Sequence, residues 1–191
     1  SNTGFNGLSD AFHPFVRAAI LPPRASRVRK VHFNSWEAAY FSFDETSLKD
    51  LASAAAGIGT ERFVLDDGWF AGRRDDTSSL GDWRVDRQRF ANGLTPLIDH
   101  VRALGMDFGI WVEPEMVNPD SDLYRQHPDW CVHVSGAARP TMRHQLWLDM
   151  SREEVRDHVF GQLDVLLSAH AIAYVKWECN RFQVPATSGG A

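Results

Sequence analysis

Apolar residues in this chain fall into short continuous runs separated by longer stretches with helical spacing. The continuous runs predict buried strands near residues 28–36, 63–65, 108–112 and 172–178. Between them, apolar residues three and four positions apart predict helices at about 46–57, 95–104 and 151–169. Strands and helices that alternate in this way predict a parallel sheet whose crossover connections are helices.

The last predicted helix has the clearest signals. Ser151-Arg152-Glu153-Glu154 matches a capping box at its start. The residues expected to face inward are Val155, Val159, Leu163, Leu166 and Leu167.

The two ends of the chain have little apolar content. Residues 1–27 hold a few apolar side chains interrupted by prolines, which predicts a lead-in segment with a short helix at about 10–20. Residues 183–191 are small and polar and are expected to form a flexible tail. The fold is therefore expected to lie within residues 28–182.

Two long segments interrupt the alternation. Residues 70–93 form a polar loop. Residues 114–150 form a longer excursion, with a short helix near 121–126 and an extended piece at 146–148. We interpret that piece as part of the loop, because no helix-length pattern separates it from the third strand.

Acidic or tryptophan side chains follow the end of every predicted strand. They are Trp36, Asp66, Asp67, Glu113 and Glu178. A (β/α) barrel places its active site at these ends. A doubly wound sheet has the same alternation, but it usually carries a glycine-rich phosphate loop, and no such sequence follows any strand here. We therefore predict an α/β fold, a partial (β/α)8 TIM-type barrel of about four βα units, which is a half-barrel.

The last strand carries the strongest chemical signal. Alternation along a strand puts Lys176 and Glu178 on one face and Trp177 on the other. An adjacent ammonium keeps a carboxylate ionised, and an ionised carboxylate can attack an electrophilic carbon. A structural ion pair at a strand end is the alternative interpretation.

Composition narrows the classes of function. The formal net charge is −5 without a basic patch, so nucleic acid is not an expected partner, and no apolar run is long enough for a membrane span. Cys131 and Cys179 have no metal-like spacing, and the cytoplasm is the expected compartment. Neither a cofactor nor a metal is expected. Seven tryptophans suit either a large core or a sugar-binding cleft.

Several short motifs, in order, resemble the catalytic domain of glycoside hydrolase family 36, the microbial α-galactosidases. They are Asn34-Ser35-Trp36-Glu37-Ala38, Phe63-Val64-Leu65-Asp66-Asp67-Gly68-Trp69-Phe70, Leu80-Gly81-Asp82-Trp83, Phe108-Gly109-Ile110-Trp111-Val112-Glu113-Pro114-Glu115-Met116, His127-Pro128-Asp129-Trp130 and Lys176-Trp177-Glu178-Cys179-Asn180-Arg181. Each motif alone is weak, whereas their order over about residues 4–181 is specific.

The resemblance implies a retaining α-galactosidase that acts on terminal α-galactosides of the melibiose or raffinose type. Glu178 occupies the position of the family's nucleophile. Five further residues match positions that hold the galactose, and Trp36 matches another wall of the pocket. The five are Asp66, Asp67, Trp111, Arg143 and Lys176.

Each of these residues also has a structural interpretation. Asp66 or Asp67 could cap a loop, Trp111 could be core packing, and Arg143 could pair with Asp149 on the surface. A divalent-metal site is a further alternative, because the acids at the strand ends, Glu113 among them, could cluster as oxygen ligands. Lys176 and the tryptophans argue against a metal.

Two departures from the family bear on activity. The family's nucleophile is an aspartate, and the extra methylene of Glu178 shifts the carboxylate by roughly 1 Å, a misplacement that can cost ~100-fold in rate. The chain also stops after the fourth strand, whereas the family's acid/base lies on a later strand. The expected result is an inactive chain. The alternative function is a non-catalytic half-barrel with residual sugar binding, which forms a homodimer or larger assembly through its open sheet edges.

Overall fold

The computed structural model describes residues 4–21 and 29–182. Contacts divide the chain into two units, 1–30 and 31–191, and each is described by itself. The predicted boundary between residues 27 and 28 and the predicted tail at 183–191 lie outside the described residues.

The described part of the first unit is an amphipathic helix. Helix α1 (Gly4–Phe15) continues into a π-helical turn, η1 (Val16–Ile20), so the helix begins earlier than the predicted residue 10. Its apolar residues recur at helical spacing and are all exposed within this unit; they are Phe5, Leu8, Phe12 and Phe15.

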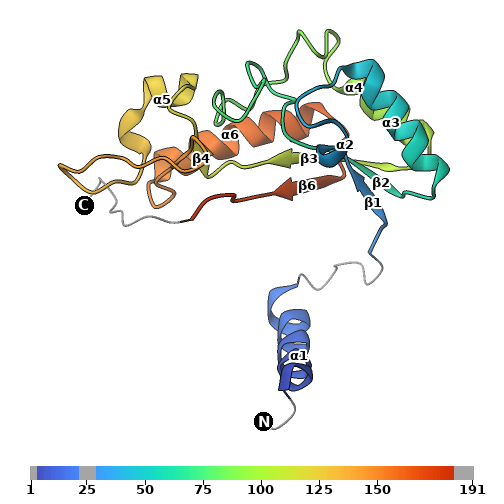
Figure 1. Ribbon diagram of the computed structural model, residues 1–191, viewed down its shortest axis with the longest axis horizontal. Coiled ribbons are helices and arrows are strands. Elements are labelled where there is room, and N and C mark those ends of the chain that lie inside the picture. The colour runs from blue at the N-terminus through green and yellow to red at the C-terminus, as the bar shows by residue number, and fades with distance from the viewer. Residues whose placement is uncertain (1–3, 22–28, 183–191) are drawn as a thin grey trace. The chain divides into compact units, whose positions relative to one another are not determined.

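The second unit is organised around a four-stranded parallel sheet, as the alternation predicts. Its strands are β1 (His32–Asn34), β2 (Arg62–Leu65), β3 (Asp107–Val112) and β6 (Tyr174–Trp177), and they lie side by side in that order (Figure 1). β1 is shorter than predicted because the chain turns at Ser35 into the short helix α2 (Trp36–Ala39).

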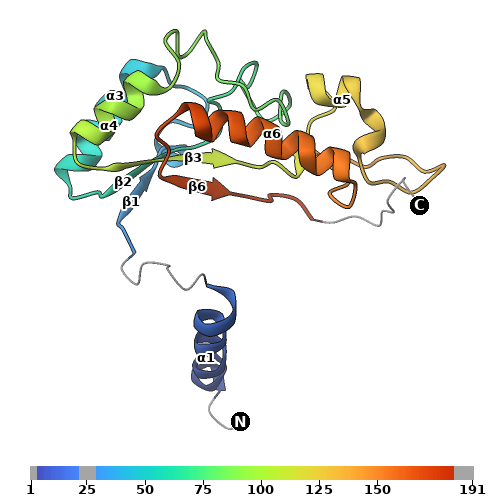
Figure 2. The same cartoon turned by 180° about the vertical axis from the view of Figure 1, so that it is seen from behind.

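Three helices connect the strands. α3 (Glu45–Gly57), α4 (Thr95–Ala103) and α6 (Glu153–Ala169) lie on the same side of the sheet (Figures 1 and 2). Their buried faces and the strands enclose one apolar core, which also takes in Trp69, Trp83 and Trp111. No helix among the described residues is long and apolar enough to cross a membrane.

Two details predicted for α6 are wrong. The helix follows Arg152 and has no side-chain cap, because the Ser151 hydroxyl donates to Asp149 at 2.6 Å and is no longer available to the helix. Leu167, expected to face the core, is 41% exposed, whereas Leu166 is buried. The apolar stripe of α6 is therefore narrower than the sequence pattern predicts.

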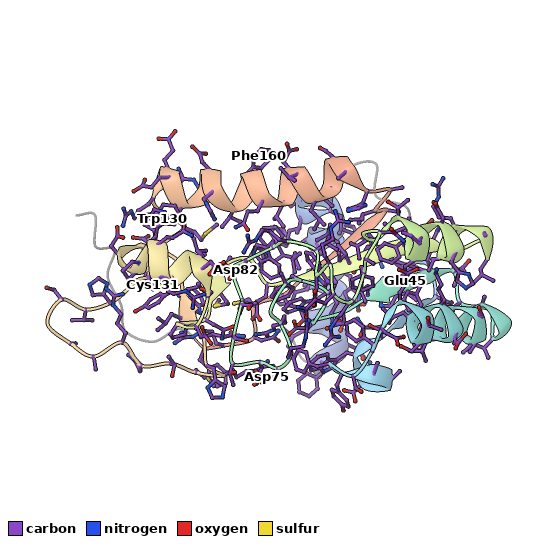
Figure 3. All side chains as sticks on the ribbon, turned by 90° about the horizontal axis from the view of Figure 1, so that it is seen from above. Glu45, Asp75, Asp82, Trp130, Cys131 and Phe160 are labelled. Atoms are coloured by element: carbon purple, nitrogen blue, oxygen red, sulfur yellow. The ribbon has the colours of Figure 1, made fainter. Side chains whose placement is uncertain are left out.

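The long excursion has more regular structure than expected. It holds β4 (Met116–Val117), α5 (Asp122–Gln126), the 3₁₀ turn η2 (Pro128–Trp130) and β5 (Leu146–Trp147). The extended piece predicted at 146–148 is therefore a strand, although it pairs with β4 in a separate antiparallel sheet. Trp130 and Cys131 belong to a second buried cluster, close to α5 (Figure 3).

Buried polar contacts fix the polar loop at 70–93. The Asp82 carboxylate accepts from the backbone N–H groups of Asp122 and Leu123 at the start of α5, at 2.8 and 2.9 Å. The side chain of Gln162 on α6 donates to the carbonyl of Gly81 and accepts from the backbone N–H of Trp83. The loop therefore has a defined position above the sheet.

Gly109 in the middle of β3 has no room for a side chain. A Cβ there would lie 3.0 Å from the ring of Tyr174 on β6 and 3.2 Å from Val64 on β2. We expect Gly109→Ala to lower the free energy of unfolding by about 1–3 kcal/mol, because the packed side chains of Tyr174 and Val64 would have to shift. Chemical denaturation followed by circular dichroism measures this change.

Gly161 provides the matched control. It lies in α6, and a Cβ there would meet nothing within 4 Å. Gly161→Ala is therefore expected to stabilise the protein by about 0.5–1 kcal/mol, since alanine has the higher helix propensity. Equal effects of the two substitutions would show that the close approach at Gly109 does not exist.

Candidate active site

A polar cavity of about 230 Å³ opens where the strands of the main sheet end. It contains every residue that the sequence singled out for the site. Its lining residues are Trp36, Asp66, Asp67, Arg73, Trp111, Glu113, Arg143, Lys176, Glu178 and Asn180. The loops after the strands carry these residues to one place, as the carboxyl edge of a parallel sheet does.

The carboxylate of Glu178 is held by three donors. Oε1 lies 2.8 Å from Nζ of Lys176. Oε2 accepts from the indole N–H of Trp111 at 3.0 Å and from the side-chain amide of Asn180 at 2.6 Å. Both oxygens therefore have fixed positions.

These contacts set the charge of the group. Burial raises the pKa of Glu178, but the hydrogen bonds from Lys176, Asn180 and Trp111 outweigh it, so the pKa of this carboxyl is lowered from its ordinary value. Burial likewise lowers the pKa of Lys176, and its bonds to Asp66 and Glu178 outweigh that effect and raise it. The carboxylate and the ammonium therefore stabilise each other in their charged forms.

Lys176 also joins Glu178 to Asp66. Its ammonium lies 2.7 Å from Oδ2 of Asp66, which accepts a second bond from the side chain of Asn34 at 2.5 Å. The other oxygen of Asp66 accepts from the backbone N–H of Asp67. One cation thus connects the ends of β2 and β6, and Asn34 adds the end of β1.

Asp67 has a separate partner that sequence reasoning missed. Arg73 is 1% exposed and binds Asp67 in a two-pronged pair, with N–O distances of 2.9 and 2.7 Å. Burial raises the pKa of Asp67 and the guanidinium opposes the rise. The only signal in the sequence is an arginine a few residues after the acid pair, in a loop rich in charged residues.

Trp111 is a core residue and a hydrogen-bond donor together. Its ring is 2% exposed and packs near Phe70 and Trp83 at centroid distances of 6.5 and 5.9 Å. Its indole N–H reaches Glu178. Trp36 is less buried and meets Tyr40 and Phe41 edge to face. Contact of either ring with a sugar stays a prediction.

Glu113 braces the loop that follows β6. It is buried, and its two oxygens accept from the side chain of Gln145 at 3.0 Å and from the backbone N–H of Asn180. Burial raises the pKa of Glu113. Because Asn180 in turn donates to Glu178, this brace also supports the carboxylate at the end of β6. Asn180 was not predicted as a site residue.

Arg143 is exposed at the cavity and makes no hydrogen bond or ion pair with any residue that the structure describes. The alternative pairing of Arg143 with Asp149 is therefore absent among the described residues. Its guanidinium lowers the pKa of Glu113 through its charge, although burial dominates there. The described residues contain no group of three histidines, cysteines or acids that could hold a metal ion.

Fold and site together define an α/β domain with a carboxylate-lined cavity suited to a polyhydroxylated ligand. The chain matches the Melibiase family over residues 1–190 and belongs to that family.

Two curated relatives illustrate the match. An α-galactosidase from Escherichia coli is 47% identical over 190 residues, which is 100% of this chain and 27% of the relative. The α-galactosidase AgaA from Geobacillus stearothermophilus is 47% identical over 182 residues, 95% of this chain and 25% of AgaA. The chain therefore spans about a quarter of the length of these relatives.

Solved structures agree. The α-galactosidase AgaB from Geobacillus stearothermophilus has a TM-score of 0.92 and 46% identity, covering 100% of this chain and 27% of AgaB. A variant of AgaA in complex with stachyose has the same TM-score at 45% identity and the same coverage of both chains. The α/β fold with its parallel sheet is thus the one found in family 36 α-galactosidases.

Removal of the indole donor should change the ionisation of Glu178. In Trp111→Phe the oxygen Oε2 keeps only the bond from Asn180, so we expect the pKa of Glu178 to rise. Because the folded-state pKa of Glu178 lies below its ordinary value, this group stabilises the fold above the unfolded-state pKa, and the stabilisation is lost as the pH falls through the folded-state pKa. The window of acid loss should therefore move to higher pH in the variant. Carbon-13 NMR titration of the glutamate carboxyls measures the shift.

Trp83→Phe is the matched control. The indole nitrogen of Trp83 is buried and has no hydrogen-bond partner among the described residues, although its ring lies beside Trp111. This substitution should leave the pKa of Glu178 unchanged. A Glu178 titration that is identical in Trp111→Phe and the wild type would contradict the assigned hydrogen bond.

Proposed function

We propose that this cavity is the galactose-binding and nucleophile-bearing part of a retaining α-galactosidase site. One observation carries the proposal: Glu178 is kept ionised by Lys176, Asn180 and Trp111 within a cavity rich in donors and acceptors. The resemblance to the family implies a nucleophile at the position of Glu178, which supports the proposal. The α-galactosidases AgaA and TtGalA, solved with stachyose and with p-nitrophenyl α-D-galactopyranoside, support an α-galactoside as substrate.

In the proposed reaction an oxygen of Glu178 bonds to the anomeric carbon. The glycosidic bond breaks, and its electron pair goes to the leaving oxygen, which takes a proton from a general acid. Water then attacks the same carbon, gives up a proton to the conjugate base, and releases galactose and the free carboxylate. The oxygen that does not attack keeps its hydrogen bonds. The carboxylate is therefore held in one position, and such an attack needs the attacking oxygen to be held close to the anomeric carbon.

The general acid is proposed to come from outside the described residues. The cavity's other carboxyls are all engaged: Asp66 by Lys176, Asp67 by Arg73, and Glu113 by Gln145 and the backbone of Asn180. Each oxygen of these three carboxyls already accepts a hydrogen bond from the protein. The described residues alone would therefore bind and attack without protonating.

The remaining side chains suit the recognition of sugar hydroxyls. Asp66 and Asp67 are acceptors, Lys176 and Arg143 are donors, and hydrogen bonds to charged groups are the stronger class. Of these four side chains, Arg143 is the one available to bind a sugar hydroxyl, because its guanidinium has no hydrogen-bond or ion-pair partner among the described residues. We assign the rings of Trp36 and Trp111 to the apolar face of the sugar.

The described sheet supports the proposed half-barrel. Sequential strand order, with α3, α4 and α6 on one side, is the arrangement of βα units in a (β/α) barrel. A doubly wound sheet reverses its strand order and carries helices on both faces. The two free thiols, Cys131 and Cys179, fit the reducing cytoplasm that we propose as the compartment.

The 191-residue chain should bind galactose weakly and hydrolyse p-nitrophenyl α-D-galactopyranoside slowly. General acid catalysis typically contributes ~10²–10⁴-fold, and no described residue supplies it, although an aryl leaving group needs less help. Glu178→Gln should remove the residual turnover, and Lys176→Met should remove binding as well. Calorimetric titration with galactose and release of nitrophenolate measure the two effects.

Glu115→Gln is the matched control for Glu178→Gln. Glu115 accepts from the exposed indole of Trp177 and does not line the cavity, so binding and turnover should remain those of the wild type. Turnover that survives in Glu178→Gln, or galactose binding that is unchanged in Lys176→Met, would overturn the proposed site.

The alternative function is that of a self-associating half-barrel, and one observation favours it. β1 and β6 lie at the two edges of the main sheet, so each has one side without a partner strand from residues 4–21 or 29–182. Unpaired strand edges pair with other chains unless they are blocked. A homodimer in which two sheets complete one barrel is the simplest closed arrangement.

Self-association should depend on the strand edges. Val31, directly before β1, and Trp177, the last residue of β6, are exposed. A lysine at an edge opposes pairing because its charge would have to be buried. We expect the wild-type chain to sediment as a dimer or larger species at micromolar concentration, and Val31→Lys with Trp177→Lys to shift it toward the monomer. Phe160→Lys is the control, because Phe160 is also an exposed apolar residue but lies on helix α6 and not on a strand (Figure 3). A wild-type monomer with a cooperative melt would rule out edge pairing.

A further inference from the structure

The backbone at Arg143 has an unusual conformation. Arg143 and His144 both have positive φ angles, 52° and 60°. They are the two central residues of a tight turn, because Met142 and Gln145 on either side bond to each other in both directions. A hairpin turn with two positive φ angles normally takes asparagine or glycine, and neither central residue here is one of these.

Such a conformation persists only where surrounding contacts enforce it. The carbonyl of His144 accepts a hydrogen bond from the side-chain amide of Asn118 at 2.7 Å. Asn118 is 0% exposed, so the donor of this bond has no access to water. If the turn relaxed to negative φ, the side chain of Arg143 would leave its position at the cavity.

The same amide also holds Arg73, a second of the three cationic side chains that line the cavity. Oδ1 of Asn118 accepts from Nη1 of Arg73 at 2.9 Å and from the backbone N–H of Leu80 at 2.9 Å. Arg73 in turn holds Asp67. The nitrogen of the Asn118 amide faces two carbonyls, those of His144 and Asp76, while its oxygen faces two N–H groups, so the orientation of the amide is unambiguous.

The backbone of Asn118 is fixed as well. Its N–H donates to the carbonyl of Leu80 at 3.0 Å, and its carbonyl accepts from the hydroxyl of Ser121 at 2.8 Å. The side chain therefore starts from a rigid base. It connects the loop that carries Arg73 to the turn that carries Arg143.

We propose that Asn118 is a positioning residue that sets two ligand-binding groups of the cavity, Arg143 through its N–H donor and Asp67 through Arg73. It lies outside the cavity lining and acts through the residues that it holds. The assignment rests on the proposed function, in which Arg143 and Asp67 bind galactose. It goes beyond that function by naming the residue that fixes the positions of Arg143 and Asp67 relative to each other.

Two substitutions separate the two tasks. Asn118→Asp keeps an acceptor for Arg73 but presents no donor to the carbonyl of His144, so only the turn should loosen. Asn118→Leu has a similar size and removes both contacts. We expect galactose to bind about 10-fold more weakly to Asn118→Asp and about 100-fold more weakly to Asn118→Leu, because charge-assisted bonds to the sugar are lost one after the other.

A second measurement needs no ligand. Nitrogen-15 relaxation should show the backbone of the turn at Arg143 becoming mobile in both variants. Arg73 should become mobile in Asn118→Leu only. This pattern follows from the separate donor and acceptor sides of the amide.

A rescue variant distinguishes positioning from general stabilisation. Glycine adopts positive φ without strain, so His144→Gly should keep the turn formed even without the bond from Asn118. The double variant Asn118→Asp with His144→Gly should therefore bind galactose within about 3-fold of His144→Gly alone, a smaller loss than Asn118→Asp causes in the wild type. Gln162→Ala is the control, since Gln162 also bridges two segments but does not line the cavity; it should lower the melting temperature and leave galactose affinity unchanged.

The outcomes are distinguishable. If both Asn118 variants lower the melting temperature but leave galactose affinity and the relaxation of Arg143 unchanged, Asn118 is only structural and the inference is wrong. If the wild type does not bind galactose, the proposed function fails, and the relaxation of Arg143 and Arg73 still decides whether Asn118 positions them. Mobility of Arg73 in Asn118→Asp would also overturn the assignment, because the acceptor is retained there.

Discussion

The site depends on the two ion pairs of the Lys176 ammonium. This ammonium lies 2.7 Å from Asp66 and 2.8 Å from Glu178, and so it joins the ends of β2 and β6, which are not neighbours in the sheet. Two carboxylates this close would repel each other without a cation between them. A carboxylate that must stay ionised while partly buried needs such a partner, because burial alone would favour its neutral form. The ion pairs of Lys176 therefore connect the strand ends and also keep the carboxylate of Glu178 ionised.

Around this centre the aromatic core and the polar site share residues. Trp111 is packed with Phe70 and Trp83, yet its N–H reaches Glu178. A donor whose ring is fixed on all sides loses little freedom when it binds, so its direction is set before any ligand arrives. Both the core and the cavity account for the tryptophans. Trp69 and Trp83 are buried in the core and do not line the cavity, whereas Trp36 and Trp111 line it.

The sheet and most of the site residues could be predicted from the sequence for identifiable reasons. Continuous apolar runs mark β2 and β3, and the carboxyl ends of parallel strands meet at one edge, so Asp66, Asp67 and Glu178 could be placed together without coordinates. Arg73 and Asn118 were missed, because their roles come from long-range contacts inside irregular loops that have no periodic pattern. The start of α6 was misjudged for a related reason: a local cap at Ser151 competed with a bond to Asp149, and the sequence does not show which one prevails.

Glu178 shows how the surroundings can adapt to a longer side chain. The extra methylene relative to an aspartate changes where the carboxylate sits, and here Oε2 meets Trp111 and Asn180 while Oε1 meets Lys176. The position of Asn180 is set by the bond of its backbone to the buried Glu113, which is itself held by Gln145. The carboxylate is therefore fixed by donors from β3, from β6 and from the loop beyond it. A residue of another length at this position would need the Asn180 loop to move, and that loop is tied down by buried groups, so the length of the side chain and the path of the loop are linked.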